Sequence, residues 1–243
     1  KRRTVTNRLA TQMLHRKNQL NVLATMRQIT ATSADSAKQS ERAFEMRRVH
    51  MSQIGYVCVA HTPPEGMKVG INKQMSIFAF IAPSSSSEVL KKIVLNDPYI
   101  IHESKLNHLE IYNGKYSRVY VNGHLIGYTN NSTKVENIYR NKRRELEINP
   151  YTTVYWDNVQ NEIQMFVDFG RICRPLIIVY NNKRDSNKYT GESKEFEQGI
   201  AITKEDISLL YQKKKTLDDL LIEGKIEYIT PEEQQNYYVC SEY

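Results

Sequence analysis

The spacing of hydrophobic and polar positions changes near residue 56. Residues 4–29 place most apolar side chains three or four apart and contain no Pro or Gly, which predicts one or two basic amphipathic helices. From residue 56 onward the apolar residues come in short runs bounded by turn residues, beginning with 56–60 and 76–82, as is typical of strands. The pattern predicts an α+β fold, in which a basic helical segment precedes a body of hairpins and surface helices.

Two β-hairpins are predicted in that body. Asn122-Gly123 lies between Val-Tyr-Val and His-Leu-Ile, and Asn-Gly tolerates the positive φ that both central positions of a type I′ turn require. Residues 152–170 predict a second hairpin that turns around 157–162. Further strands are predicted at 174–180 and 226–229.

Three more helices are predicted, over residues 87–95, 133–147 and 203–223. Ser87 is a possible N-cap of the first, and Asn149-Pro150 closes the second, which is charged enough to lie on the surface. The third begins with a capping box between Thr203 and Asp206 and stops at Gly224. Polar stretches predict loops or exposed insertions at 30–41, 84–87 and 181–199.

Composition excludes several classes of protein. The chain is 40% hydrophobic and 25% charged, and no apolar run approaches the roughly 18 residues of a membrane span or forms a signal-peptide core. Its three cysteines are far apart and form no CxxC pair, which argues against a zinc site and a disulfide framework. We therefore expect a reducing, intracellular location and no contact with membranes.

The net charge of +7 is concentrated at one end of the chain. Residues 1–50 hold eleven Lys and Arg against three Asp and Glu, while the rest is nearly neutral. Such a segment is expected where only one part of a protein meets phosphates, although a solvated basic surface without a partner has the same composition.

No self-contained catalytic apparatus is present. Asp168-Phe169-Gly170 spells the kinase metal-binding tripeptide, but the glycine-rich loop and the HRD catalytic loop are missing, so a turn at a strand end is the better interpretation. No P-loop or HExxH motif occurs. Cys58 and His61 could pair as nucleophile and base, but a lone cysteine in an apolar strand is usually part of the core.

A basic turn remains as the candidate site. Four residues surround the Pro-Pro-Glu-Gly sequence at 63–66: Arg42, Arg47, Arg48 and Lys68. Arginine can bind phosphate through two parallel hydrogen bonds, and a rigid Pro-Gly turn can hold such side chains in place. The alternative is a solvated loop in which the arginines pair with neighbouring glutamates.

The same stretch carries a family resemblance. SERAFEMRRVHMSQIGYVCVAHTPPEGMKVGINKQM resembles the fork region of the second-largest, beta-type subunit of multisubunit DNA-directed RNA polymerases. RVYVNGHLIG is similar to the family hairpin V-F-V-N-G-V-x-x-G. RNKRRELEINP and VDFGRICRPLIIV are similar to R-R-x-G-x-I-N-P and T-D-A-G-R-x-x-R-P-L-x-I-V, and LLIEGKIEYI is similar to L-L-x-x-G-x-V-E-Y-I. These landmarks occur in the family order and cover nearly the whole chain.

The resemblance implies a piece of a polymerase subunit, with a fork region at 1–82 and two external domains at 83–150 and 151–243. In that family the fork lies beside the active centre, near the RNA–DNA hybrid and downstream DNA, and contacts the largest subunit, which holds most of the catalytic Mg²⁺ ligands. We therefore expect no catalytic residue, metal ligand or cofactor on this chain, and no activity from the chain in isolation.

The resemblance also assigns residues. Arg47 and His50 fall on the arginine and histidine of the fork pattern, Arg42 on an arginine of the preceding run, Glu65 on the end of E-T-P-E-G, and Lys73 on the following lysine. With Arg48, they are expected near the nucleic acid and the active centre.

Departures from the pattern make the chain resemble polymerases of large DNA viruses more than cellular ones. They are His61 in place of a glutamate, an inserted Pro64, and Met51 in place of a proline. A viral chain would be located in a cytoplasmic viral factory, a virion or the nucleus. A second hypothesis is a stand-alone module, derived from a polymerase, that binds nucleic acid or protein without transcription.

Overall fold

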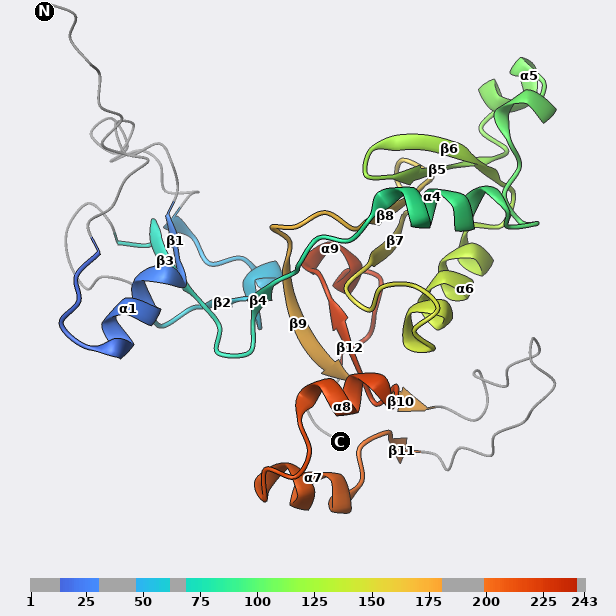
Figure 1. The fold of residues 1–243 in the computed structure, drawn as a ribbon. Coiled ribbons are helices and arrows are strands. Elements are labelled where there is room, and N and C mark those ends of the chain that lie inside the picture. The colour runs from blue at the N-terminus through green and yellow to red at the C-terminus, as the bar shows by residue number, and fades with distance from the viewer. Residues whose placement is uncertain (1–13, 31–46, 62–68, 181–198, 240–243) are drawn as a thin grey trace, which may run out of the picture. The chain divides into compact units, whose positions relative to one another are not determined.

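The structure is a computed structural model that describes residues 14–30, 47–61, 69–180 and 199–239. The chain forms two compact units, Lys1–Phe80 and Ile81–Tyr243 (Figure 1). Helices and strands are mixed along the chain, which confirms the predicted α+β fold. The finer division at residues 82 and 150 stays a prediction.

The first unit is built on a small antiparallel sheet of strand order β1-β3-β2. The strands of this sheet are β1 (Gln28–Thr30), β2 (Val57–Cys58) and β3 (Asn72–Met75). The described residues of the unit also form the helix α1 (Gln19–Met26) and the 3-10 turn η2 (Met51–Gln53). The prediction of helix up to residue 29 is wrong at its end, because Ile29 pairs with Lys73 in the sheet. Strand pairing with a distant segment overrides the local periodicity. Residues 4–13 lie outside the described residues.

The second unit contains a four-stranded sheet of order β6-β5-β8-β7. It joins two hairpins, β5 (Ser117–Val121) with β6 (His124–Thr129), and β7 (Thr153–Asp157) with β8 (Glu162–Phe166), through parallel pairing of β5 with β8. Both predicted hairpins are confirmed. Asn122 has φ 48° and Gly123 has φ 77°, as the predicted type I′ turn requires.

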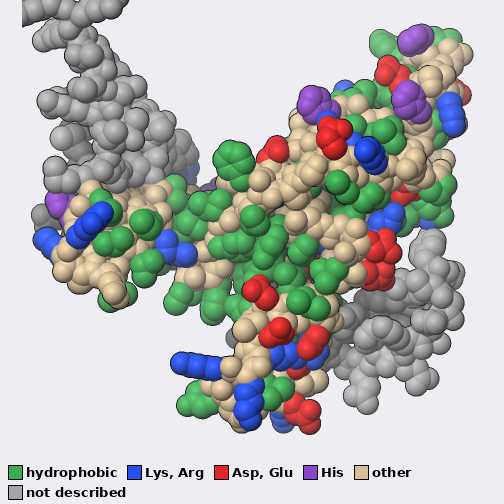
Figure 2. Space-filling model, in the orientation of Figure 1, with side chains coloured by type: hydrophobic (Ala, Val, Ile, Leu, Met, Phe, Trp, Pro, Cys, Tyr) green, Lys and Arg blue, Asp and Glu red, His purple; other side chains and the backbone are tan. Residues whose placement is uncertain are grey.

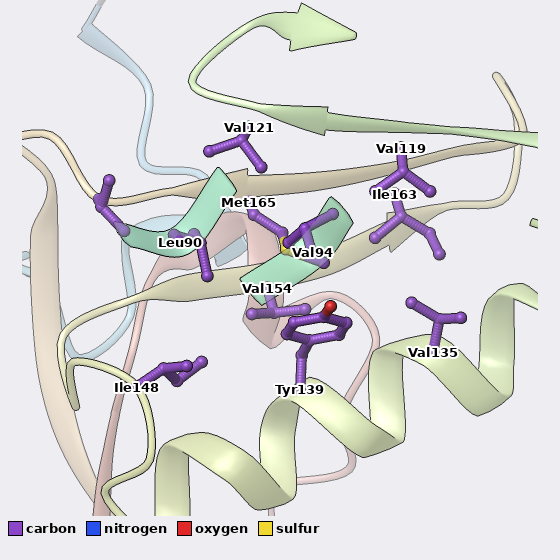
Figure 3. Close-up of a cluster of buried hydrophobic side chains, with 11 residues drawn as sticks. Leu90, Val94, Val119, Val121, Val135, Tyr139, Ile148, Val154, Ile163 and Met165 are labelled. Carbon is purple, nitrogen blue, oxygen red and sulfur yellow. The ribbon is translucent and has the colours of Figure 1, made fainter. Parts of the chain in front are cut away.

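Helices α4 (Ser87–Leu95) and α6 (Ser132–Arg144) contribute to the core on one face of this sheet (Figure 3). Leu90 and Val94 come from α4, Val135 and Tyr139 from α6, and the strands supply alternate residues that point to the same side. The sheet residues in this cluster are Val119, Val121, Val154, Ile163 and Met165. Ser86 rather than the predicted Ser87 is the N-cap of α4, because the helix already includes Ser87.

Helix α6 confirms the prediction for 133–147 but is not simply a surface helix. It buries Val135, Tyr139 and even Arg143, which recur every four residues and therefore share one face. It ends at Arg144, before the predicted Asn149-Pro150 stop, with Leu146 at φ 61°. The amide of Leu146 donates to the Arg143 carbonyl and that of the following residue to the Lys142 carbonyl, which is a Schellman closure.

A three-stranded sheet, a two-stranded ladder and several short helical elements complete the described structure. A three-stranded sheet has the order β12-β9-β4, from β4 (Phe80–Ile81), β9 (Ile172–Ile177) and β12 (Ile226–Ile229). Strand β10 (Val179–Tyr180) pairs with β11 (Gly199–Ile200), so the predicted strand 174–180 is divided in two. Short helical elements complete the unit: η3 (Glu103–Lys105), α5 (His108–Tyr112), α7 (Lys204–Tyr211), α8 (Leu217–Ile222) and α9 (Pro231–Gln234).

The single helix predicted over 203–223 is wrong, because the chain forms α7 and α8 instead. The capping box of Thr203 with Asp206 is confirmed, and a second one, of Thr216 with Asp219, starts α8. Between them Lys213 adopts φ 56°, which a right-handed helix cannot include. Gly224, with φ 69°, ends α8 as predicted. Most of the 181–199 insertion and of the 30–41 loop lies outside the described residues.

Candidate nucleic-acid interface

The described part of the first unit carries only basic charges. Its charged side chains are Arg16, Lys17, Arg27, Arg47, Arg48 and Lys73, and it contains no Asp or Glu within 14–30, 47–61 or 69–80. The glutamates that could pair with these arginines, Glu41, Glu45 and Glu65, lie outside the described residues, so the alternative of a neutralised loop stays a prediction. A positive potential on this unit favours contact with phosphates.

Arg47 connects the two ends of the candidate segment through a hydrogen bond. Its side chain is half-buried, and Nη1 donates a hydrogen bond of 2.5 Å to the carbonyl of Val69. Gly70 has φ 70°, and a Cβ added there would lie 2.8 Å from the carbonyl oxygen of Arg47 and 3.0 Å from its Cβ. Only glycine fits this conformation at this distance. The contact therefore joins the two ends of the segment 47–70, on which Arg48, His50 and Glu65 also lie.

The other predicted site residues occupy different positions. Arg48 and His50 are exposed, and His50 caps η2, with Nδ1 accepting from the amide of Ser52 at 3.2 Å. Lys73 is half-buried on β3, opposite Ile29. Arg47, Arg48 and His50 are thus close together because they are near neighbours in the sequence, whereas Lys73 lies on a separate strand. Arg42 and Glu65 lie outside the described residues.

Arg27 is a residue that the sequence did not single out. Its Nη2 donates to the carbonyl of Ser76 at 2.5 Å and to that of Ala79 at 2.8 Å. It thereby fixes a turn whose Ile77 and Phe78 side chains are 87% and 66% exposed. The acceptors are backbone carbonyls about fifty residues away, so no local sequence signal could have identified this role.

The residues considered for catalysis lie in a β-strand and in a turn. Cys58 lies on β2 opposite Gln74. Asp168 accepts a hydrogen bond of 2.8 Å from Nδ2 of Asn122, and Gly170 has φ 91°, so this tripeptide is a turn after β8, as predicted. Within the part of the chain that the structure describes, no group of three or more His, Cys, Asp or Glu could hold a metal ion. None of the described helices is long and apolar enough to span a membrane.

A buried ion-pair network lies in the second unit. Arg143 is 2% exposed and donates to Glu233, which is fully buried, at 2.7 and 2.8 Å. Glu227 accepts from Arg143 at 2.9 Å and from Arg144 at 2.7 Å. Burial alone would raise the pKa of Glu227, but the two arginines outweigh it and lower that pKa to about 2. The network joins α6 to β12 and α9, so these arginines are not available to a phosphate.

The described residues of the first unit expose many large apolar side chains. Among its described residues the buried hydrophobic side chains are Tyr56 and Ala79. Its exposed large ones are Leu14, Leu20, Leu23, Met26, Val49, Met51, Ile54, Val59, Ile77 and Phe78. Figure 2 shows green hydrophobic and blue basic side chains side by side on this unit. The described part of this unit therefore leaves most of its large apolar side chains exposed, which is expected where other protein surfaces cover them.

Comparison with known proteins identifies relatives of both units. The family profile of RNA polymerase Rpb2 domain 3 matches residues 12–81, and that of Rpb2 domain 4 matches residues 119–180. DNA-directed RNA polymerase subunit Rpo2 of Saccharolobus solfataricus is 32% identical over 239 residues, which are 95% of this chain and 19% of that protein.

Two eukaryotic proteins are similar over a comparable length. DNA-directed RNA polymerase II subunit RPB2 of Schizosaccharomyces pombe is 28% identical over 98% of this chain, and RNA polymerase III subunit RPC2 of Saccharomyces cerevisiae is 29% identical over 95%. The chain spans about a fifth of the length of these relatives, 19% and 18% respectively.

Proposed function

Since the chain belongs to the family of second-largest subunits of DNA-directed RNA polymerase, we propose that it supports DNA-templated RNA synthesis as part of such a subunit. The observation that carries this proposal is the match to Rpb2 domains 3 and 4, in that order, by segments of both units. In the assembled enzyme the chain contributes to a nucleotidyltransferase, and by itself it is inactive.

The first unit contacts the RNA–DNA hybrid and downstream DNA in this proposal. Support comes from its exclusively basic described charges and from the Arg47–Val69 contact, which holds the ends of the segment 47–70 together. Arg48 and His50 lie exposed on that segment, so they can meet phosphates, whereas Arg47 acts at least in part as a positioning residue. Arg42, Glu65 and Lys73 keep the places near the active centre that the family resemblance gives them.

The chain's contribution to phosphoryl transfer is positioning and electrostatic stabilisation. The Mg²⁺ that this reaction uses is, in this proposal, held mainly by the largest subunit. The largest subunit and other polymerase subunits are also the proposed partners for the exposed apolar side chains of the first unit. The viral origin and the intracellular location stay predictions.

The test compares Arg47→Ala with Arg16→Ala in the assembled polymerase. Both changes remove one positive charge from the first unit, but the Arg16 side chain is exposed, whereas Arg47 is half-buried and bonded to Val69. We expect Arg47→Ala to slow elongation by more than tenfold and Arg16→Ala to change it by less than twofold. Wild-type elongation by the Arg47→Ala enzyme would refute the assigned role.

The salt dependence of nucleic-acid binding separates two contributions of Arg47. If its guanidinium also neutralises a phosphate, the slope of log Kobs against log salt falls by about 0.9 in the variant. If Arg47 only positions the segment, the slope stays unchanged while elongation falls. An isolated chain that binds nucleic acid, together with an assembled enzyme that transcribes normally without it, would favour the stand-alone binding module instead.

A further inference from the structure

A cavity of about 170 Å³ lies in the second unit, beside the C-terminal end of α5 (Figure 1). Protein cavities of about 150 Å³ hold one benzene molecule, so this one has room for a single six-membered ring. It is partly open to solvent, and its lining comes from the end of α5, the β5–β6 hairpin and the turn between β7 and β8. The lining side chains are mainly those of Ile111, Tyr116, Arg118, Tyr128, Gln160 and Asn161.

One side of the cavity is the face of the four-stranded sheet that is turned away from the hydrophobic core. Arg118 and Tyr128 stand opposite each other in the register of β5 and β6, so their side chains lie on the same face. Val119 and Val121 belong to the core cluster of Figure 3, and side chains alternate along β5, so Arg118 points to the other face. The cavity therefore combines a sheet surface with the two turns that rise beside it.

Asn161 ties these turns together. Its Oδ1 accepts a hydrogen bond from the hydroxyl of Ser117, and its backbone carbonyl accepts from the amide of Arg118 at 3.2 Å. Its Nδ2 makes only long hydrogen bonds, of 3.4 Å to the carbonyl of Gly114 and 3.5 Å to that of Tyr116. Hydrogen bonds of this length are weak, so a ligand acceptor at a shorter distance can replace them.

The polar groups of the cavity favour a neutral ligand that accepts hydrogen bonds. The guanidinium of Arg118 lies 2.6 Å from the carboxylate of Glu162, so its charge is balanced within the chain. Tyr128 is 5% exposed, and its hydroxyl makes no hydrogen bond to any residue that the structure describes. Burial, helped by the negative charge of Glu103, raises the pKa of Tyr128, so the hydroxyl stays protonated and can donate.

We propose that this cavity binds a pyrimidine base, presented by a free nucleoside or by single-stranded nucleic acid. A pyrimidine base is a flat, neutral single ring, and the Tyr128 hydroxyl and Asn161 Nδ2 would donate to its carbonyl oxygens. The side chains of Tyr116 and Ile111 would contact the ring itself. A purely apolar ring would leave both donors without an acceptor. The inference concerns the second unit alone and does not rest on the proposed role in transcription.

The test uses uridine as the probe and the full chain as the receptor. Saturation-transfer difference NMR follows a titration with uridine, and we expect saturable binding in which the base protons receive more saturation than the ribose protons. Adenosine should bind at least tenfold more weakly, because its two fused rings exceed the cavity. Hexauridylate distinguishes the two sources: an affinity more than sixfold above that of uridine indicates single-stranded nucleic acid, and an equal affinity per base indicates a free nucleoside.

Two pairs of variants locate the binding. Ile111→Trp fills the cavity and should weaken uridine binding at least tenfold, whereas Leu109→Trp adds the same side chain to α5 at a position that is 70% exposed and should leave binding unchanged. Tyr128→Phe removes only the hydroxyl and should weaken binding about fivefold, the equivalent of one neutral hydrogen bond. Its control is Tyr155→Phe, on β7 of the same sheet and outside the cavity lining.

Tyr128→Phe keeps the test decisive if Ile111→Trp does not fold, because it removes a single oxygen atom. Four results would overturn the proposal: no saturable binding of uridine, adenosine binding as tight as that of uridine, equal effects of the two tryptophan substitutions in folded chains, or an unchanged affinity in Tyr128→Phe.

Discussion

The C-terminal end of α6 offers the sharpest test of the backbone geometry. Leu146 has φ 61°, a left-handed conformation that is uncommon for any residue with a Cβ, and it stands where the polymerase pattern R-R-x-G-x-I-N-P has glycine. The structure therefore explains that glycine as the residue that closes the helix without strain. Substituting Leu146 by glycine and, separately, by alanine isolates the backbone effect, because both changes remove the same exposed leucine side chain.

The magnitude follows from two opposing contributions. Left-handed backbone costs a residue with a Cβ about 1–2 kcal/mol. The greater freedom of glycine in the unfolded chain costs about 0.4–1 kcal/mol. We therefore expect Leu146→Gly to be more stable than Leu146→Ala by about 1 kcal/mol. At Asn137, an exposed position inside α6, alanine should instead be more stable than glycine by about 1 kcal/mol.

Urea unfolding provides the measurement. The only tryptophan of the chain, Trp156, lies half-buried on β7, so its fluorescence reports the unit that contains α6. The four variants should share one m-value, and the glycine–alanine preference should change sign between positions 146 and 137. If alanine is also the more stable residue at position 146, the left-handed conformation and the Schellman closure are refuted.

Two further predictions concern the candidate site and the buried ion pairs. Gly70→Ala should locally unfold the first unit and increase the amide hydrogen exchange of that unit, because the new Cβ would lie 2.8 Å from the Arg47 carbonyl oxygen. Gly114→Ala is the control: Gly114 has a similar φ of 68°, but a Cβ there would have no atom within 4 Å, so this variant should show backbone strain alone. Equal effects of the two substitutions would refute the close approach at Gly70. The unfolding free energy of the second unit should fall by roughly 3 kcal/mol between pH 4.5 and pH 2. The reason is that folding lowers the pKa of Glu227 from 4.5 to about 2, so the stabilisation by the Glu227 carboxylate is lost as this group is protonated over that range. Urea unfolding at each pH measures this fall, and Glu227→Gln should flatten it, although Asp206, whose pKa is also lowered by its lysine partners, keeps part of the slope.

Most of the secondary structure of the second unit could be predicted because its signals are local. Asn122-Gly123 specifies a turn by its own backbone preferences, and the Thr203–Asp206 capping box needs only residues three apart. The break between α7 and α8 was missed because Lys213 carries no such preference. It adopts a conformation more typical of glycine, and the lysine and carboxylate pairs around Asp206 hold the flanking segments in place.

The candidate site was predictable in its charge but not in its geometry. The residues of the fork pattern could be named from the sequence, and the excess of basic residues near them was evident. The bond from Arg47 to Val69 could not be foreseen, because a backbone carbonyl has no sequence signature. The same holds for Arg27, whose acceptors lie at positions 76 and 79. A basic side chain that the sequence suggests is available to a phosphate can therefore be engaged in a hydrogen bond that stabilises the fold.

The sequence by itself determined the family, the α+β fold, the hairpins and the basic character of the first unit, since each rests on composition, on neighbouring residues or on ordered motifs. Only the tertiary structure decided which charges are buried. Arg143 and Glu233 are ninety residues apart and form a buried pair, although each stands in a stretch that looks like solvated surface. The reason is physical: a charge can be buried only where a partner is brought within hydrogen-bond reach, and chain topology rather than local pattern decides which residues meet.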